Sequence, residues 1–346
     1  MIKVVKILEH LIDDCTEKYS IGQFKPNHRI FYSRKYGYRV EWWSRDNRKN
    51  RHPNVSTVEK YETIAHVETF IDNIRLWGWE WCNISWWVAQ FFFWGSVIWT
   101  ANGVLAVWPL ADAQLQLALS GWTAFAGGLI FIFGGYAAFL EVVNQSKTIK
   151  LGHYLSIQSR RSCEDDRNLL PSIKPLTGNS EIRFLFLKFR TIFTKWRFFG
   201  SDISDWGWWL NAVQLFGALV FFVACVTAIP GILPNNHLLQ NTIYWLPQII
   251  GATFFIIASL MAMREVQLGL FSFPVLKIGW QVGVWNLIGA IGFFLSGLFG
   301  LILNTPLLCN SNLSFWGASF STLWGSIAFL IASYLMLIEI LNKHKK

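Results

Sequence analysis

Three stretches of the chain begin with glycine and end, fourteen residues later, with glutamate: residues 127–141 (GGLIFIFGGYAAFLE), residues 251–265 (GATFFIIASLMAMRE) and residues 325–339 (GSIAFLIASYLMLIE). In each stretch a phenylalanine follows the first glycine by four residues, and a small residue follows it by seven. These offsets fall on one face of an α-helix. Each stretch therefore predicts a helix that aligns glycine, phenylalanine and glutamate along one side.

A related pattern precedes each of these stretches. A glycine is followed by an aromatic residue after four positions and is preceded by a tryptophan nine positions earlier. The glycines of both patterns are Gly95, Gly127, Gly217, Gly251, Gly289 and Gly325. Because the patterns alternate, they predict three tandem copies of one two-helix unit. Glycine lets helix backbones approach closely in lipid, so we expect helix packing at these positions, with a ligand groove as the alternative.

The composition is that of an integral membrane protein. Hydrophobic residues make up 53% of the 346 residues and charged residues only 15%, against roughly a quarter charged in soluble domains. Six nearly charge-free stretches are long enough to cross a bilayer core of ~30 Å as helices. They are residues 86–108, 118–140, 206–229, 243–263, 279–303 and 315–338. We predict an all-α polytopic membrane protein with six transmembrane helices in three tandem repeats, plus cytoplasmic amphipathic helices.

The charge distribution predicts the orientation. All 30 Lys and Arg residues lie in segments 1–80, 142–205, 264–278 and 342–346, which fall on alternate sides of the predicted spans. The positive-inside rule places these segments and both termini in the cytoplasm. The net charge of +9 then favours contact with anionic lipid headgroups. It does not favour a nucleic-acid partner, because the sequence contains no recognisable nucleic-acid-binding motif.

The predicted organisation has five segments. They are a basic cytoplasmic region (1–80), a first transmembrane hairpin (81–145), a basic cytoplasmic loop (146–205), a second hairpin (206–266), and a third hairpin with a short basic tail (267–346).

The cytoplasmic segments carry their own structural signals. Aromatic residues between Arg29 and Trp43 predict a β-hairpin that turns near residues 35–37. Amphipathic patterns predict a short helix at residues 1–14 and an interfacial helix at residues 181–199. Another helix starts at Ser56 or Thr57, reaches Ile74 and should lie along the membrane surface or on the cytoplasmic ends of the spans.

Glu141, Glu265 and Glu339 are the candidate functional carboxylates. A carboxylate on the packed face of a membrane helix is costly and is a functional candidate by default. At the cytoplasmic helix ends, however, each can pair with a basic residue that precedes a span, such as Arg75 or Arg197. Convergence of all three carboxylates on one cation or proton is the alternative hypothesis.

The sequence shows no catalytic, cofactor or metal motif. The seven histidines lie outside the predicted spans, and no two have the i, i+4 spacing of a helical metal site. The five cysteines include no C-x-x-C pair. Serine and threonine in the spans lack a partnering base. We therefore predict no catalytic residues, no metal and no cofactor, and we assign the 20 tryptophans mainly to aromatic belts near the span ends.

Three functions are compatible with these features. The leading hypothesis is a non-enzymatic scaffold, sensor or lipid-interacting protein, with the bilayer, a second copy or another membrane protein as partner. The alternative is a small transporter or channel that uses the three glutamates. The spans offer it few polar groups, chiefly Gln90, Asn102, Thr123 and Gln214. A membrane-embedded enzyme is the third possibility.

Residues 285–297 (WNLIGAIGFFLSG) and 324–333 (WGSIAFLIAS) resemble the YrhK-like family of small bacterial membrane proteins. Each of the two helices in that family carries a glycine, a small residue and, three positions further on, an aromatic residue. The resemblance extends to the paired spans of all three copies and implies this two-helix architecture in a prokaryotic inner membrane. It implies no activity. Where the family has Arg-Pro at the end of the second helix, this chain carries Glu141, Glu265 and Glu339.

Overall fold

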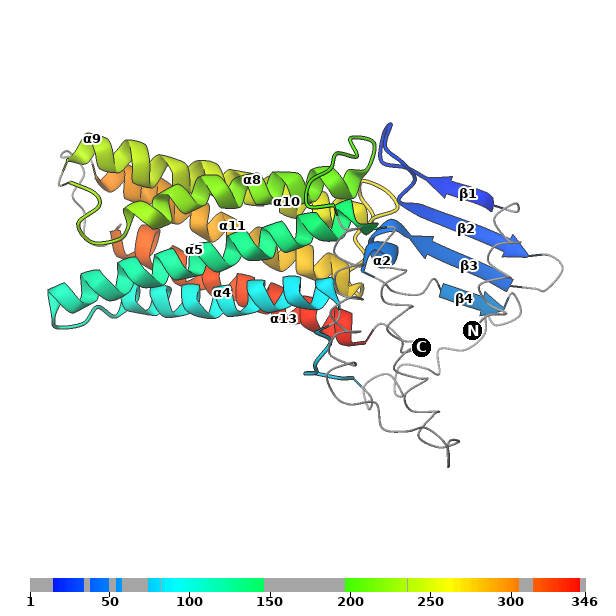
Figure 1. Ribbon diagram of the computed structural model, residues 1–346, viewed down its shortest axis with the longest axis horizontal. Coiled ribbons are helices and arrows are strands. Elements are labelled where there is room, and N and C mark those ends of the chain that lie inside the picture. Colours follow the sequence, from blue (N-terminus) through cyan, green and yellow to red (C-terminus); the bar gives the residue numbers. More distant parts are fainter. Residues whose placement is uncertain are drawn as a thin grey trace, which may run out of the picture.

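The computed structural model describes residues 15–33, 38–49, 54–57, 74–81, 83–145, 197–234, 236–304 and 314–342. These residues form a long helical bundle with a small β-sheet at one end (Figure 1). We call this end of the bundle the sheet end and the opposite one the far end. The described part is mostly helical, and six of its helices are long and apolar enough to span a membrane, as predicted.

The six spans match the apolar stretches of the sequence to within a few residues; the first and third end slightly earlier than their stretches, and the others extend slightly beyond them. Four are single helices: α4 (Ile84–Val107), α5 (Ala113–Val143), α8 (Trp206–Thr227) and α11 (Ile278–Leu303). The fourth span consists of α9 (His237–Gln240), the π-helical turn η2 (Asn241–Trp245) and α10 (Leu246–Glu265). The sixth begins with the π-helical turn η3 (Ser314–Ser319) and continues as α13 (Phe320–Leu341).

Polar residues explain where several spans begin. The side chains of Asn83, Asp112, Asp205 and Asn236 accept hydrogen bonds from backbone N–H groups in the first turn that follows each of them. These N–H groups have no partner within the helix. The capped helices therefore start a few residues before, or at, the first strongly apolar residue.

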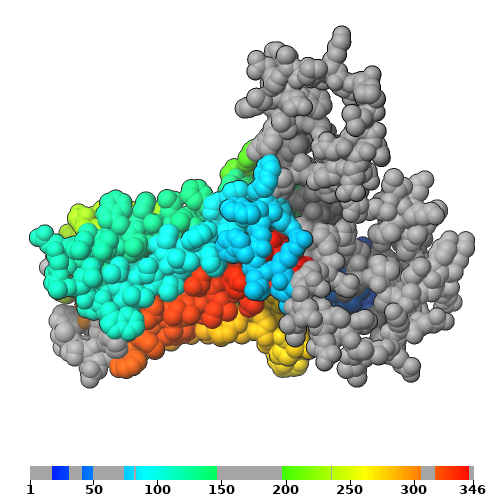
Figure 2. Space-filling view, turned by 90° about the horizontal axis from the view of Figure 1, so that it is seen from below, coloured from blue at the N-terminus to red at the C-terminus, as the bar shows by residue number. Residues whose placement is uncertain are grey.

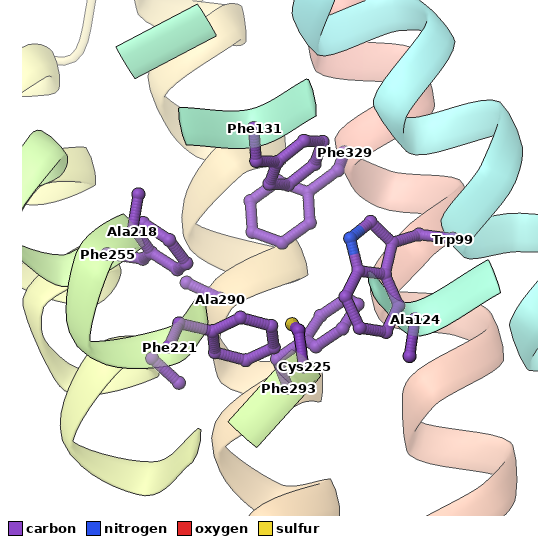
Figure 3. Packing of buried hydrophobic residues seen from close by; sticks show 11 residues of the cluster. Trp99, Ala124, Phe131, Ala218, Phe221, Cys225, Phe255, Ala290, Phe293 and Phe329 are labelled. Atoms are coloured by element: carbon purple, nitrogen blue, oxygen red, sulfur yellow. The ribbon is translucent and has the colours of Figure 1, made fainter. Parts of the chain in front are cut away.

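The spans form a closed ring. Each packs against the next in the order α4, α5, α8, α10, α11 and α13, and α13 packs against α4. Figure 2 shows α4 (cyan) beside α13 (red) on one face of the molecule. Aromatic residues from all six spans fill the interior (Figure 3): Trp99, Phe131, Phe221, Phe255, Phe293 and Phe329. The rings of Trp99, Phe221 and Phe293 meet pairwise at steep angles, with centroids 5.0 to 5.6 Å apart.

The repeated glycines lie where the two helices of each hairpin touch. A Cβ atom added to Gly251 would lie 2.6 Å from Cβ of Phe221 and 2.8 Å from its backbone nitrogen. The relation is reciprocal, because a Cβ atom on Gly217 would approach Phe254 and Phe255. The same reciprocal contacts link Gly95 with Phe131, Gly127 with Trp99, Gly289 with Phe329, and Gly325 with Phe293. The aromatic residue of each helix thus occupies the space beside the glycine of its partner.

The N-terminal region adds a four-stranded antiparallel sheet in the order β1 (Cys15–Tyr19), β2 (His28–Ser33), β3 (Tyr38–Trp43) and β4 (Asn54–Thr57). Strands β2 and β3 correspond to the hairpin predicted over residues 29–43, where aromatic and β-branched residues favour strands. The all-α class predicted from the sequence therefore applies to the bundle and not to the whole chain. A short helix, α2 (Ser44–Arg48), follows β3 directly.

The predicted amphipathic helices fall largely outside the described residues. This applies to residues 1–14 and to most of the helix predicted to end at Ile74. Its expected first residues, Ser56 and Thr57, lie in β4. Residues 197–199, the described end of the helix predicted over 181–199, are not helical.

The glycine contacts generate a prediction for stability. Gly251→Ala should destabilise the bundle by about 1–3 kcal/mol, because the new methyl group overlaps the Phe221 backbone. Gly135→Ala in α5 is the matched control, since its Cβ would lie 3.5 Å from Leu215, an ordinary contact. Thermal unfolding in detergent measures both. Equal melting temperatures for the two variants would contradict the assigned packing.

Candidate functional site

The three candidate glutamates end three of the spans at the sheet end of the bundle. Glu141 lies in α5, Glu265 in α10 and Glu339 in α13. Each is at most 4% exposed. A buried carboxylate without a counter-charge costs several kcal/mol. The partners of these three carboxylates are therefore decisive for what the site does.

The partners come from α2 and from Lys49, the residue that follows it. Arg45, Arg48 and Lys49 have the spacing i, i+3, i+4, which places them on one face of a helical turn. All three are buried. The sheet positions this turn, because α2 continues from β3 and the Ser44 N–H donates to the Asn27 carbonyl oxygen at 2.8 Å. We call these three basic residues and the three glutamates the ion cluster.

The ion cluster contains one bidentate pair and one shared carboxylate. Arg48 donates from Nη1 and Nη2 to the two carboxylate oxygens of Glu265, at 2.8 and 3.0 Å. Arg45 Nη2 and Lys49 Nζ both donate to Oε2 of Glu339, at 2.9 and 2.7 Å. Glu141 is held less closely, with its Oε1 4.0 Å from Nε of Arg48. Equal numbers of acids and bases leave the cluster without formal net charge.

Small residues in the first turns of the odd spans make room for the arginines. Gly207 in α8 faces the guanidinium of Arg48, and Gly279 in α11 faces that of Arg45. A Cβ atom on Gly279 would lie 3.0 Å from Nε of Arg45. Ser85 occupies the same place in α4, ten residues before a repeated glycine, as the other two do. The two glycines that face the arginines thus lie at equivalent positions of the sequence pattern.

Burial and charge act in opposite directions on the basic groups. Burial favours the neutral form of Arg48, but attraction to Glu265 outweighs it and raises the pKa of Arg48. The pKa of Arg45 is likewise raised, by Glu339 and Glu265 against burial. For Lys49, burial and the neighbouring charge of Arg45 prevail and lower the pKa. The two arginines are therefore the firmly charged members of the cluster.

An additional acid lies at the edge of the cluster. Asp205 caps α8 by accepting a hydrogen bond from the Gly207 N–H at 2.9 Å. Burial raises the pKa of Asp205, and the charge of Arg48 opposes this rise. Asp205 thus links the start of α8 electrostatically to the same arginine that binds the end of α10.

Further contacts hold the sheet against the bundle. Asn27 Nδ2 donates to the Glu265 carbonyl oxygen at 3.1 Å, and the Lys25 N–H donates to the Ser204 carbonyl oxygen at 2.8 Å. Lys277 Nζ lies 3.9 Å from the ring centroid of Trp43, a cation–π geometry. These contacts reach the chain before α8, the last residue of α10 and the chain before α11, so the N-terminal region touches two of the three hairpins here as well.

Within the sheet, a carboxylate beside these contacts is strongly stabilised in its charged form. Hydrogen bonds with His28, at 2.9 Å, and from Trp43, at 3.0 Å, lower the pKa of Glu41 to about 2. The His28 ring stacks on Trp43 with a centroid distance of 4.0 Å. This packing orders the strand that leads into α2.

The glutamates pair with partners other than Arg75 and Arg197, the examples offered by the sequence. Those two residues use their backbone groups instead, bonding to the side chains of Asn342 and Asn144 respectively. The carboxylates do converge, as the alternative hypothesis required, but on basic groups of the same chain. Helix α2 was not predicted. Its one signal in the sequence is the helical spacing of three basic residues directly after an aromatic strand.

The polar residues predicted in the spans do not join the ion cluster. Asn102 Nδ2 donates to Thr123 Oγ1 at 2.9 Å within the first hairpin. Gln90 accepts from Trp94 Nε1 in its own helix. In the part of the chain that the structure describes, no group of three His, Cys, Asp or Glu residues is placed to hold a metal ion.

No protein-family model, curated protein or solved structure matches the chain. The geometry of the chain itself therefore carries the functional argument.

The ion cluster generates a prediction for its energetics. Arg48→Met should destabilise the protein by about 3–5 kcal/mol, because it leaves Glu265 buried and unpaired. Adding Glu265→Met should restore much of this loss, since apolar side chains can replace a buried ion pair. Thermal unfolding of the single and double variants in detergent measures both effects.

The matched control removes an exposed pair between the same two parts of the molecule. Lys25 Nζ lies 2.6 Å from Asp202, and both side chains are about half exposed. Lys25→Met should therefore cost about 1 kcal/mol or less. A similar cost for Arg48→Met and Lys25→Met would show that the ion cluster is not a buried structural element.

Proposed function

We propose that the protein is a non-enzymatic membrane protein whose six-helix bundle holds the N-terminal sheet at the cytoplasmic face of the membrane, as a scaffold or sensor. The ion cluster is the observation that carries this proposal. Three spans each contribute a terminal glutamate, and one short helix of the N-terminal region supplies counter-charges to all three. Buried ion pairs can specify one arrangement among alternatives. The cluster thus defines the position of the sheet on the bundle.

The distribution of charge supports the proposed orientation. All Lys and Arg residues lie in segments that flank the sheet end of the spans, and none lies in residues 109–117, 230–242 or 304–314 between them. By the positive-inside rule the sheet end faces the cytoplasm.

Equivalent hydrogen bonds support three tandem repeats. Trp86 Nε1 donates to the Gly78 carbonyl oxygen at 3.0 Å, and Trp208 Nε1 donates to that of Gly200 at 2.9 Å. The next residue in each repeat makes a second such bond, from Trp87 to Trp81, from Trp209 to Ile203 and from Gln281 to Val275. The second bond spans six residues in all three repeats, whereas the first is made in two of them and Trp280 Nε1 has no partner among the described residues. From the bond that recurs in all three repeats, we infer a pseudo-threefold arrangement of the hairpins.

Exposed apolar side chains before the odd spans support a lipid partner. They occur at matching positions of the three repeats and are Leu76, Trp77, Trp79, Phe198, Phe199, Leu270, Phe271 and Phe273. Aromatic and apolar residues next to a span prefer the membrane interface. We infer that these segments rest in the headgroup region, where nearby basic residues attract anionic lipid.

The orientation is tested by labelling single cysteines in a variant without its five natural cysteines. Cysteine at Asn179 should react with an impermeant maleimide only from the cytoplasmic side, and cysteine at Asn236 only from the opposite side. Reaction of both from the same side would overturn the six-span topology.

A small transporter or channel is the second candidate. One observation favours it: the basic groups of α2 cover three carboxylates at one end of a closed ring of helices. If α2 left this position, the ring would present three acids to the cytoplasm. Gln90, Gln214 and Glu265 do not line the large cavity described below, so it offers no polar route between those residues.

One variant separates the two candidates. The triple change Arg45→Gln, Arg48→Gln and Lys49→Gln removes the counter-charges, so hydrogen exchange in residues 28–43 should rise at least about tenfold while the spans stay protected. Neither wild type nor variant should move K⁺, Na⁺ or H⁺ across liposomes. Unchanged exchange in the sheet would contradict the scaffold. Ion flux in wild type, or flux that appears with the variant, would establish the second candidate.

A further inference from the structure

The far half of the bundle contains a partly open cavity of about 450 Å³ that the proposed function does not use. All six spans contribute to its lining, together with the connection around Pro230 and Gly231. Its floor is formed by Trp99, Phe221 and Phe293, the three aromatic rings that meet in the centre of the bundle. This volume lies within the ~300–1,000 Å³ typical of small-molecule sites.

The lining contains no charged residue. None of the described residues around the cavity is Asp, Glu, Lys, Arg or His. An ion placed against this lining would lose part of its hydration without gaining a counter-charge, which is unfavourable. The chemistry of the lining therefore selects an uncharged molecule.

Part of the polar lining is already bonded and forms a rigid wall. Gln248 Nε2 lies 3.3 Å from Ser296 Oγ, which lies 2.7 Å from Thr322 Oγ1. On the opposite side, Asn102 Nδ2 donates to the Ser120 carbonyl oxygen at 2.8 Å. These bonds join three pairs of spans around the cavity, so its shape is preformed.

Two lining side chains have polar groups that make no hydrogen bond to a described residue. For the side chains of Gln240 and Tyr244, the structure records no hydrogen bond to any described residue. Both come from the segment where the fourth span passes from α9 into the π-helical turn η2. Such turns change the direction of side chains relative to a regular helix and occur often at functional sites. Tyr244 also packs edge-on against Trp245, another lining residue, with their ring centroids 4.4 Å apart.

We propose that this cavity binds an uncharged, largely apolar ring compound that carries a hydroxyl or carbonyl group. The ring would pack on Trp99, Phe221 and Phe293, where edge-to-face contacts are favourable. Its polar group would bond with Tyr244 or Gln240. A lipid acyl chain fits less well, because it would leave both of these side chains without a partner.

Binding of tritiated 1-naphthol to the protein in lipid nanodiscs tests the proposal, with empty nanodiscs as the blank for partitioning. We expect one saturable site per chain, weaker binding of naphthalene, and no competition by 1-naphthalenesulfonate, which has similar rings and a charge. Binding that does not saturate, or that the sulfonate displaces equally well, would overturn the proposal.

Variants locate the site. Ala318→Phe should abolish saturable binding by filling the cavity, with Ala106→Leu as a smaller replacement if the first variant does not fold. Tyr244→Phe should weaken binding roughly two- to tenfold through loss of one hydrogen bond. Tyr334→Phe, outside the lining, is the matched control and should have no effect. Unchanged binding in Ala318→Phe and Ala106→Leu would refute the site. A phospholipid that copurifies with wild type and is absent from both variants would also refute it, because a lipid would then be the occupant.

Discussion

Three buried carboxylates at the ends of α5, α10 and α13 impose the constraint on which the rest of the structure depends. Such groups are tolerated only when counter-charges are brought to them with good geometry. This protein does so for Glu265 and Glu339 with the basic residues of one short helical segment, while Glu141 lies 4.0 Å from Arg48 without a direct hydrogen bond to it. Strand β3 must end where α2 begins, and the first turns of α8 and α11 must carry glycine so that Arg48 and Arg45 fit. The sheet and the bundle are therefore parts of one electrostatic arrangement.

The convergence of the carboxylates depends in turn on how the hairpins pack. In lipid there is little hydrophobic drive between helices, so close contact must come from shape. Within each hairpin, the aromatic side chain of one helix packs beside the glycine of the other, and this reciprocal packing provides the contact. It also sets the register, because each glutamate lies fourteen residues from the glycine on the same helix face. Six aromatic rings then fill the middle of the bundle. The interior is left with charge at one end and a cavity at the other.

The spans, the repeated glycines and the β2–β3 hairpin follow from local patterns, which is why they could be read from the sequence. The ion cluster could not, although its three acids could be named. Its basic half lies in a polar stretch between two strands, and Arg45 and Glu339 are separated by 294 residues. No periodicity relates groups so distant. The cavity was missed for a similar reason, because it depends on a change of helical type at residues 241–245 and on side chains from all six spans.

The sequence separation of the cluster has a consequence for biosynthesis. The N-terminal region leaves the ribosome first, but the carboxylate that binds both Arg45 and Lys49 belongs to the last span. Domains generally begin to fold in the order of their synthesis, and here the sheet must wait for its docking site. Arg48 can meet Glu265 once the second hairpin is in place, but Arg45 and Lys49 find Glu339 only after the third hairpin has been added. Closure of the cluster is therefore a late event in assembly, and it can occur only on a chain whose six spans have all been inserted.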